Sequence, residues 1–339
     1  MPSIRRMLRS AGTAFVLVVA RVSAVPACSV CLAGDPSFST QGASAQAVGD
    51  VSVFFEARAW EQSSGRRSRA AAAGGHGGHA GHESGEEGDE AGSSEERHRS
   101  RRLDLYVAWT PLDRLTLSLD LPFVWNAVAE RAVGGWTHAS LAGLGDAALA
   151  ASWVAWRNRE VLPSTWIELR GFVEAPTGRS AQRVDGEVDP HLQPGTGSWD
   201  GGLGVAAGHR LELGALYASV LYRINSEGSL DYRYGDVLLA NAALEVPLGR
   251  SHERWGRFVP GLELNFRWAG RDERDGERVP DTGGGMLYAT PFLRVRLPAF
   301  SSTQRAWLRT AIQIPTTDAW LHGRQDEGAV WSVGLGYGF

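Results

Sequence analysis

The sequence predicts an all-β fold: an antiparallel transmembrane β-barrel of the outer-membrane type, with about twelve strands. Three observations support this prediction. Apolar residues alternate with polar or very small ones over segments of about ten residues. The connections between these segments are alternately long and short, and the last segment ends in the aromatic residue Phe339. After the N-terminus, no apolar run approaches the roughly 20 residues that a membrane-spanning helix needs.

The N-terminal region predicts export from the cytoplasm. Residues 1–27 read as a signal peptide, because Arg5, Arg6 and Arg9 precede a short apolar stretch that is followed by small residues. Residues 28–49 are polar and rich in small residues, so we expect a periplasmic segment or a plug folded into the barrel. The alternating pattern begins at Val51, and we expect the barrel to occupy residues 50–339 in the outer membrane of a Gram-negative bacterium.

Each predicted strand shows one apolar face and one polar or glycine-rich face. In the last strand, Trp331, Val333 and Leu335 alternate with serine and glycine. An Arg that faced lipid at mid-depth would cost roughly 2–4 kcal/mol, so the charged residues within these strands should face the lumen. We expect strands near residues 50–60, 101–110, 113–126, 143–157, 163–175, 198–209, 211–225, 233–247, 257–270, 284–297, 304–315 and 328–339. The candidates for setting lumen selectivity are Glu168, Arg170, Glu174, Glu263, Arg267, Arg294, Arg296 and Arg309.

The rhythm of the connections predicts the topology. Long polar stretches follow the odd-numbered strands, at 61–100, 127–142, 176–197, 226–232, 271–283 and 316–327, and short turns follow the even-numbered ones. With a periplasmic N-terminus, the long loops are extracellular and the short turns periplasmic. Aromatic residues near strand ends predict two girdles, with Trp60, Trp125, Trp268 and Trp331 on one rim and Trp109, Trp166, Trp255 and Phe339 on the other. Tyr337 and Phe339 also fit the terminal signal that the barrel-assembly machinery recognises.

Two groups of residues are candidate metal ligands. The first long loop carries His76, His79, His82 and His98 among many acidic residues, which suits loose capture of Zn, Cu or Ni. The alternative is a solvated low-complexity loop without a metal. Cys28 and Cys31 could form a disulfide, contribute thiolates to a metal site, or be lost or lipidated on processing. We expect no other cofactor.

Nucleic-acid binding and catalysis receive little support. The net charge is -4, so a nucleic-acid partner has no electrostatic basis. The nucleophile elbow, the phosphate-binding loop and the zinc-protease helix motif are all missing from the sequence, so we expect no enzyme. A hydrolase site on the barrel rim is the remaining catalytic alternative, and its candidates are His138, His191, Asp200 and His322.

Several segments occur in the order seen in one family of barrels. They are the segment ending in DRLTLSLDLPFVWN at Asn126, then GLGD (143–146), EAPTG (174–178), LQPGTGSWD (192–200) and YGD (234–236). Over residues 50–339 the chain resembles the outer-membrane barrels of the meta-pathway of phenol degradation family. The resemblance implies a channel or transporter for small solutes, among them hydrophobic or aromatic compounds, in contact with outer-membrane lipid. A metal-binding barrel and a barrel hydrolase remain the alternatives.

Overall fold

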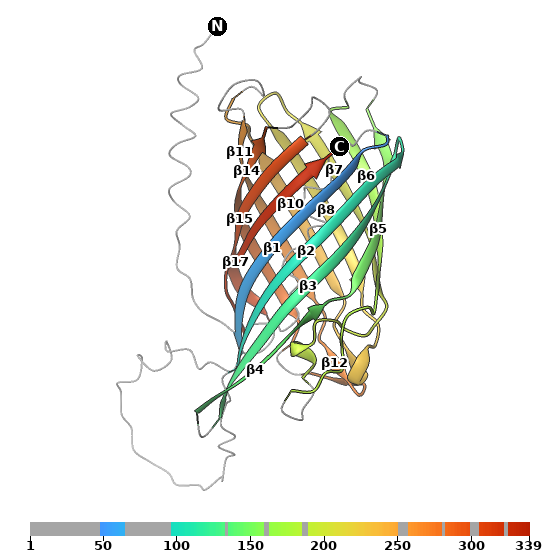
Figure 1. Cartoon of the computed structure of the whole chain (residues 1–339). Helices are drawn as coiled ribbons and strands as arrows, with labels where there is room; N and C mark the ends of the chain where they lie inside the picture. The colour runs from blue at the N-terminus through green and yellow to red at the C-terminus, as the bar shows by residue number, and fades with distance from the viewer. Residues whose placement is uncertain are drawn as a thin grey trace, which may run out of the picture.

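Twelve strands of the described residues close into an antiparallel barrel (Figure 1), which confirms the predicted fold class. The computed structural model describes residues 48–64, 96–132, 135–158, 163–184, 189–249, 257–279, 282–298, 305–321 and 325–339. The wall consists of β1 (Val51–Ser64), β2 (Glu96–Leu112), β3 (Leu115–Ala132), β5 (Ala147–Arg157), β6 (Thr165–Ala175), β7 (Asp200–Arg210), β8 (Ala215–Ile224), β10 (Val237–Glu245), β11 (Phe258–Ala269), β14 (Gly284–Leu297), β15 (Arg305–Leu321) and β17 (Val330–Gly338). The described residues contain no helix that is long and apolar enough to cross a membrane.

The first and last strands close the wall. β17 pairs with β1 over eight residue pairs, from Ser52 with Gly338 to Ala59 with Trp331. Beyond the pair of Ser52 and Gly338, Val51 and Phe339 exchange two backbone hydrogen bonds of 2.9 Å. This pairing gives β1 and β17 a partner on the side where the barrel would otherwise be open, and unsatisfied backbone groups facing lipid there would be costly.

One predicted strand is in fact two. The segment 143–157 divides into the end of β4 (Gly135–Leu144) and all of β5, with Gly145 and Asp146 between them. β5 pairs with the first part of β3, and β4 pairs with the last part, so residues 127–132 and 135–142 extend a hairpin instead of forming the predicted loop. The backbone N–H of Gly145 donates to Pro122 O at 2.9 Å and keeps the break joined to β3. The β3–β4 hairpin projects beyond the wall (Figure 1).

Small elements occupy the end of the barrel that carries the long loops, called here the long-loop end. Two short 3-10 helices, η5 (Pro190–Leu192) and η6 (Ser229–Asp231), lie in these connections. A three-stranded sheet forms from β9 (Tyr232–Arg233), β12 (Glu273–Arg274) and β13 (Glu277–Arg278), and β16 (Gln325–Glu327) extends the pairing of β1. The opposite end carries short connections such as that between β2 and β3, as the rhythm of the sequence predicted.

The alternation predicted for the strands is confirmed. In β17, Trp331, Val333 and Leu335 are exposed on the outer face, whereas Gly334 and Gly336 are buried on the inner face. The inner glycines admit aromatic rings from the neighbouring strands. A Cβ on Gly336 would lie 2.1 Å from the Trp307 ring, and one on Gly334 would lie 2.3 Å from the Phe54 ring. Glycine is therefore required at these positions for large side chains to lie flat against the inner wall.

Of the eight predicted girdle residues, five are exposed as expected, two are not, and Trp255 lies outside the described residues. Trp125, Trp268 and Trp331 are exposed towards the long-loop end, and Trp109 and Phe339 are exposed at the other end. Trp60 and Trp166 were assigned wrongly. Trp166 is only 2% exposed and Trp60 lines the interior, because each shares the strand parity of inward-facing charged neighbours such as Arg58 and Glu168.

Several sequence-based predictions lie outside the described residues. They are the signal peptide (1–27), nearly all of segment 28–49 including Cys28 and Cys31, the loop histidines His76, His79 and His82, and the girdle residue Trp255.

Candidate functional site

A series of buried ion pairs joins neighbouring strands on the inner face of the barrel. We call this series the ion-pair belt. Its contacts run from Glu263 to Arg309 (2.8 Å), Arg309 to Glu56 (3.8 Å), Glu56 to Arg58 (3.8 Å), Arg58 to Asp104 (2.7 Å), Asp104 to Arg102 (2.5 Å) and Arg102 to Asp120 (3.2 Å). No side chain in the belt is more than 11% exposed. Side chains thus fill the barrel interior at this level, and each buried charge depends on its neighbours for compensation.

Most of the predicted lumen residues are buried within the barrel. Glu263 and Arg309 belong to the ion-pair belt, and Arg267 is buried nearby on β11. Glu168 pairs with Arg170 at 2.9 Å, Glu174 with Arg223 at 2.6 Å, and Arg294 with Glu245 at 2.7 Å. Arg296 has the inward parity but is exposed where β14 ends at the short-turn side. The sequence analysis missed the charged residues that pair with them or continue the ion-pair belt, although the same alternation on strands 51–64, 96–112, 115–132, 215–224 and 237–245 carries the signal. These residues are Glu56, Arg58, Arg102, Asp104, Asp120, Arg223 and Glu245.

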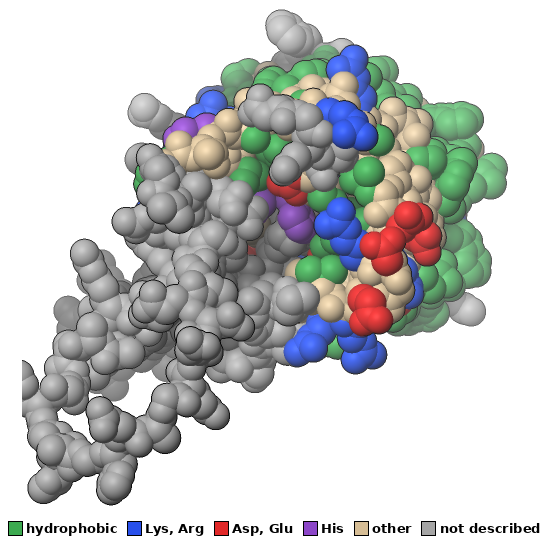
Figure 2. All heavy atoms as spheres, turned by 90° about the horizontal axis from the view of Figure 1, so that it is seen from below, with side chains coloured by type: hydrophobic (Ala, Val, Ile, Leu, Met, Phe, Trp, Pro, Cys, Tyr) green, Lys and Arg blue, Asp and Glu red, His purple; other side chains and the backbone are tan. Residues whose placement is uncertain are grey.

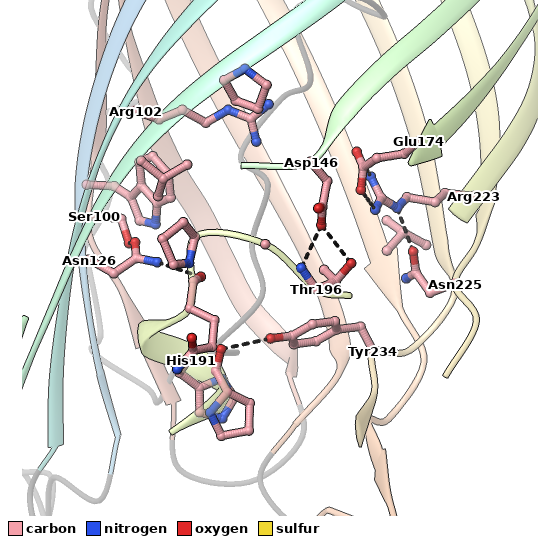
Figure 3. A pocket seen from close by; sticks show the side chains of 18 of the residues that line it. Ser100, Arg102, Asn126, Asp146, Glu174, His191, Thr196, Arg223, Asn225 and Tyr234 are labelled. Carbon is pink, nitrogen blue, oxygen red and sulfur yellow. Dashed lines mark hydrogen bonds and ion pairs between the residues drawn. The ribbon is translucent and has the colours of Figure 1, made fainter. Parts of the chain in front are cut away.

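A pocket of about 150 Å³ lies inside the barrel, between the ion-pair belt and the long-loop end. One side of the pocket is apolar, since Phe172, Leu221 and Leu239 form a buried cluster there and Val124 joins the lining. The other side is polar, with Arg102 at one end and His191 at the other (Figure 3). The remaining polar lining includes Ser100, Asn126, Asp146, Glu174, Thr196, Arg223, Asn225 and Tyr234.

The apolar lining was also missed from the sequence. An inward-facing apolar residue beside an outward-facing one produces consecutive apolar residues, as in Phe172-Val173 and in Val220-Leu221-Tyr222. In a strand with one apolar and one polar face, such pairs break the alternation. They mark the places where the interior itself is apolar.

Residues 189–198 fold back into the barrel and cover the pocket; we call them the inward segment. Asp146, at the break between β4 and β5, accepts hydrogen bonds from Gly178 N (2.8 Å), Thr196 N (2.6 Å) and Thr196 Oγ1 (2.8 Å). Since this carboxylate is buried, these three donors replace the water that it would otherwise bind. Asp146 therefore ties the inward segment to the wall (Figure 3).

Three glycines meet beside Asp146. A Cβ on Gly178 would lie 2.8 Å from the carbonyl carbon of Gly145 and 2.9 Å from the Cα of Gly195. No other residue fits so close an approach of three backbones. These glycines come from the GLGD, EAPTG and LQPGTGSWD segments, so three motifs that are far apart in the sequence build one structural unit.

The far side of the inward segment is also attached to the wall. Asn126 Nδ2 donates to Gln193 O at 3.1 Å, and Tyr234 Oη donates to Pro190 O at 3.2 Å. Burial and the nearby carboxylate of Asp272 raise the pKa of Tyr234, so its hydroxyl keeps the proton that it donates. The pocket is thus enclosed by wall strands on one side and by a doubly attached segment on the other.

Arg223 is the main cation beside the apolar cluster. It contacts Glu174 at 2.6 Å, Asp200 at 2.8 Å and Asn225 Oδ1 at 2.6 Å, and its guanidinium lies 5.7 Å from the centroid of the Phe172 ring. Both carboxylates compensate the guanidinium, so Arg223 presents no unpaired cation to the pocket.

The loops at the pocket mouth surround Asp272. Tyr232 Oη donates to its Oδ2 at 2.7 Å, and Gly235 N donates to its Oδ1 at 2.9 Å. Burial raises the pKa of Asp272, against the lowering effect of these hydrogen bonds and of His191. Figure 2 views this end, where histidine, arginine and acidic side chains gather around the centre.

Within the part of the chain that the structure describes, the candidate metal ligands and hydrolase residues do not come together in one site. His98 packs edge-on against His191, with ring centroids 5.6 Å apart. No group of three or more potential metal ligands occurs among the described residues. Of the hydrolase candidates, Asp200 binds Arg223 and the backbone N–H of Ser226, His138 lies on the outer face of β4, and His322 is outside the described residues.

Comparisons with known proteins bear on the fold. No protein-family model and no curated protein matches the sequence. A crystal structure of an outer membrane channel from Pseudomonas putida F1 aligns with a TM-score of 0.55 at 15% identity, over 87% of this chain and 97% of that chain. The chain has an outer-membrane β-barrel fold. The resemblance to the phenol degradation family remains a prediction.

Two other solved barrels align less closely. The translocator domain of the autotransporter NalP from Neisseria meningitidis has a TM-score of 0.41 at 13% identity, over 88% of this chain and 91% of that chain. The toluene transporter TbuX from Ralstonia pickettii has a TM-score of 0.38 at 10% identity, over 86% and 90%.

Proposed function

We propose that the chain is an outer-membrane channel for small, largely apolar solutes, and that the pocket beneath the inward segment is its solute-binding site. The observation that carries the proposal is the buried apolar cluster of Phe172, Leu221 and Leu239 inside the barrel, facing an internal cavity. An apolar patch turned away from lipid is of no use for membrane insertion, whereas it suits a ligand site.

The size and charge of the pocket define the solute class. A volume of about 150 Å³ matches an engineered apolar cavity that binds benzene, so a single-ring compound fits. The charged groups of the lining are already compensated, since Arg223 binds Glu174 and Asp200, and Asp146 binds the inward segment. A neutral solute therefore gains apolar contact without displacing an ion pair, which an anionic or strongly hydrated solute would have to do.

The ion-pair belt bears on conduction. Because side chains fill the interior at this level, we propose that ions do not flow steadily through the resting barrel and that a solute passes only when the wall or the belt rearranges. Planar-bilayer recordings of the reconstituted protein should then show stable insertion with little steady conductance. A large, constantly open conductance would contradict this part of the proposal.

Uptake measurements test the solute class. The chain is expressed in a porin-deficient Gram-negative host, and the initial uptake of labelled toluene, phenol, benzoate and glucose is compared with that of an empty-vector strain. We expect faster uptake of toluene and phenol and no gain for benzoate or glucose. Unchanged uptake of all four compounds would refute the proposed function.

A matched pair of variants locates the route. Leu221 is 3% exposed and lines the pocket, whereas its neighbour Val220 is 52% exposed on the lipid-facing side. Leu221→Trp fills the cavity and should abolish the gain in uptake, while Val220→Trp adds the same side chain to the outer surface and should preserve it. Equal uptake by the two variants would exclude the pocket from the route.

We propose that the signal peptide directs export and that the long loops face outward. We also propose that Tyr337 and Phe339 serve as the recognition signal for the barrel-assembly machinery. These two rings lie 5.9 Å apart at the end of the closing strand, and Phe339 is exposed.

A further inference from the structure

Three arginines form a row on the outer face of β2, and we call them the arginine row. Arg97, Arg99 and Arg101 share the parity of Leu103, which is exposed to the membrane side, while Arg102 faces the interior. The side chain of Arg99 is 67% exposed, and Arg101 is exposed as well. Alternate residues on a strand lie about 6.7 Å apart, so the row extends about 13 Å along β2.

The row begins where the apolar band of the wall ends. Arg101 pairs in register with Trp125, and the next outward residue on β2 is Leu103. Since Trp125 is exposed in the predicted girdle of the long-loop end, Arg99 and Arg97 lie at the level of the lipid headgroups. An outward-facing arginine nearer the middle of the apolar band would be costly. At the level of the headgroups, its side chain meets charged groups instead.

Neighbouring strands support the row and keep it positive. The guanidinium of Arg97 lies 4.7 Å from the centroid of the Trp136 ring on β4, and His138 is exposed in the same register. Glu61 on β1 contacts Arg99 at 3.0 Å, and both side chains are exposed. An exposed pair of this kind is weak and leaves the patch with a net positive charge.

We propose that the arginine row binds the phosphate groups of the glycolipid in the outer leaflet. Guanidinium groups bind phosphate oxygens in a two-point geometry, and a basic cluster beside a membrane-spanning segment attracts anionic lipid. The row is continuous with the lipid-facing surface, so a lipid phosphate can reach it while the acyl chains cover Leu103 and Leu144. The inference uses the orientation proposed above but not the transport activity, so the uptake and lipid-binding assays can fail independently.

Native mass spectrometry of the detergent-solubilised full-length chain tests the proposal. The protein is titrated with diphosphorylated lipid A and with its dephosphorylated form, and the two dissociation constants are compared. We expect the diphosphorylated form to bind at least about tenfold more tightly to the wild type. Arg99→Gln/Arg101→Gln should reduce this preference to less than about threefold, and this variant keeps the contact between Arg97 and Trp136. The single variant Arg101→Gln should show a preference between those of the wild type and the double variant. It replaces the double variant in the test if the double variant does not fold.

The control places the same charge loss at the other rim. Arg114→Gln/Arg157→Gln removes two arginines from the short-turn end, and it should retain the wild-type preference. Each variant is first checked for the heat-dependent gel shift of a folded barrel. A wild type without preference, a full preference in Arg99→Gln/Arg101→Gln, or displacement of lipid A by an equal concentration of inorganic phosphate would overturn the proposal.

Discussion

Asp146 and Thr196 lie 50 residues apart in the sequence and are joined by two hydrogen bonds inside the barrel. The Oδ2 atom of Asp146 accepts from the backbone N–H of Thr196 at 2.6 Å and from its hydroxyl at 2.8 Å. Asp146 is one of the two residues between β4 and β5, and Thr196 belongs to the segment that covers the pocket. A single carboxylate thus connects the break in the wall with the cover of the proposed site.

Replacing this carboxylate should release the inward segment. Asp146→Ala leaves the N–H groups of Gly178 and Thr196 without their acceptor, and hydrogen bonds to a charged group contribute about 1.5–3 kcal/mol each. We expect amide hydrogen exchange in residues 189–198 to accelerate by at least about tenfold, with little change in the wall strands.

A control at the other end of the barrel separates local release from general destabilisation. Asp113 is exposed in the short turn between β2 and β3, where it pairs with Arg157 at 2.8 Å. Asp113→Ala should leave exchange in the inward segment at the wild-type rate. Wild-type exchange in Asp146→Ala would show that other contacts, such as those from Asn126 and Tyr234, are sufficient to hold the segment.

The ion-pair belt should tolerate the loss of one partner poorly. Arg309→Ala leaves Glu263 and Glu56 buried without their shared cation, and breaking a buried pair from one side costs about 3–5 kcal/mol. Urea unfolding of the barrel in lipid vesicles should show this loss. Arg309→Met/Glu263→Gln should recover part of it, because the second change removes the charge of Glu263, whereas Glu56 keeps its contact with Arg58. A loss below about 1 kcal/mol in Arg309→Ala would mean that the belt behaves like a surface salt bridge.

The parts of the site that follow strand parity could be predicted from the sequence. A charged residue such as Arg309, placed between apolar neighbours in a membrane strand, has only the interior available to it. Its partners could not be predicted in this way, because the contact with Glu263 depends on the register and closure of the whole barrel. Parity specifies a face, whereas pairing depends on distances that no local pattern contains.

The inward segment could not be recognised because its composition resembles that of an exposed loop. Residues 189–198 contain proline, glycine, glutamine and threonine, which are typical of solvated connections. They fold inward because Asp146 and two close glycines provide a place for their backbone. The break at Gly145 and Asp146 could not be predicted either. Both parts of the interrupted strand, β4 and β5, pair with the single strand β3, so the segment reads as one strand.

Two glycines on β17 provide a direct test of the inner packing. A Cβ on Gly336 would lie 2.1 Å from the Trp307 ring, whereas the nearest atom to a Cβ on Gly338 would be 3.8 Å away. Gly336→Ala should lower the free energy of unfolding by about 1–3 kcal/mol, because the indole must leave its place on the wall. Gly338→Ala should change it by less than about 0.5 kcal/mol. Urea unfolding of the two variants under one condition gives the comparison, and equal stabilities would argue that Trp307 moves aside at no cost.

Asp272 should make the loops at the pocket mouth less stable as pH rises. Burial raises its pKa above the ordinary value of 3.8, so the folded state holds this proton more tightly than the unfolded state. The stabilisation is therefore fully present below the ordinary value and is lost as pH rises through the elevated pKa of the folded protein. Asp272→Asn removes this titration. The measured quantity is the unfolding free energy of the variant minus that of the wild type, and it should increase from a pH below 3.8 to neutral pH. A falling difference for Asp272→Asn would mean that the hydrogen bonds from Tyr232 and Gly235 outweigh burial and favour the charged carboxylate.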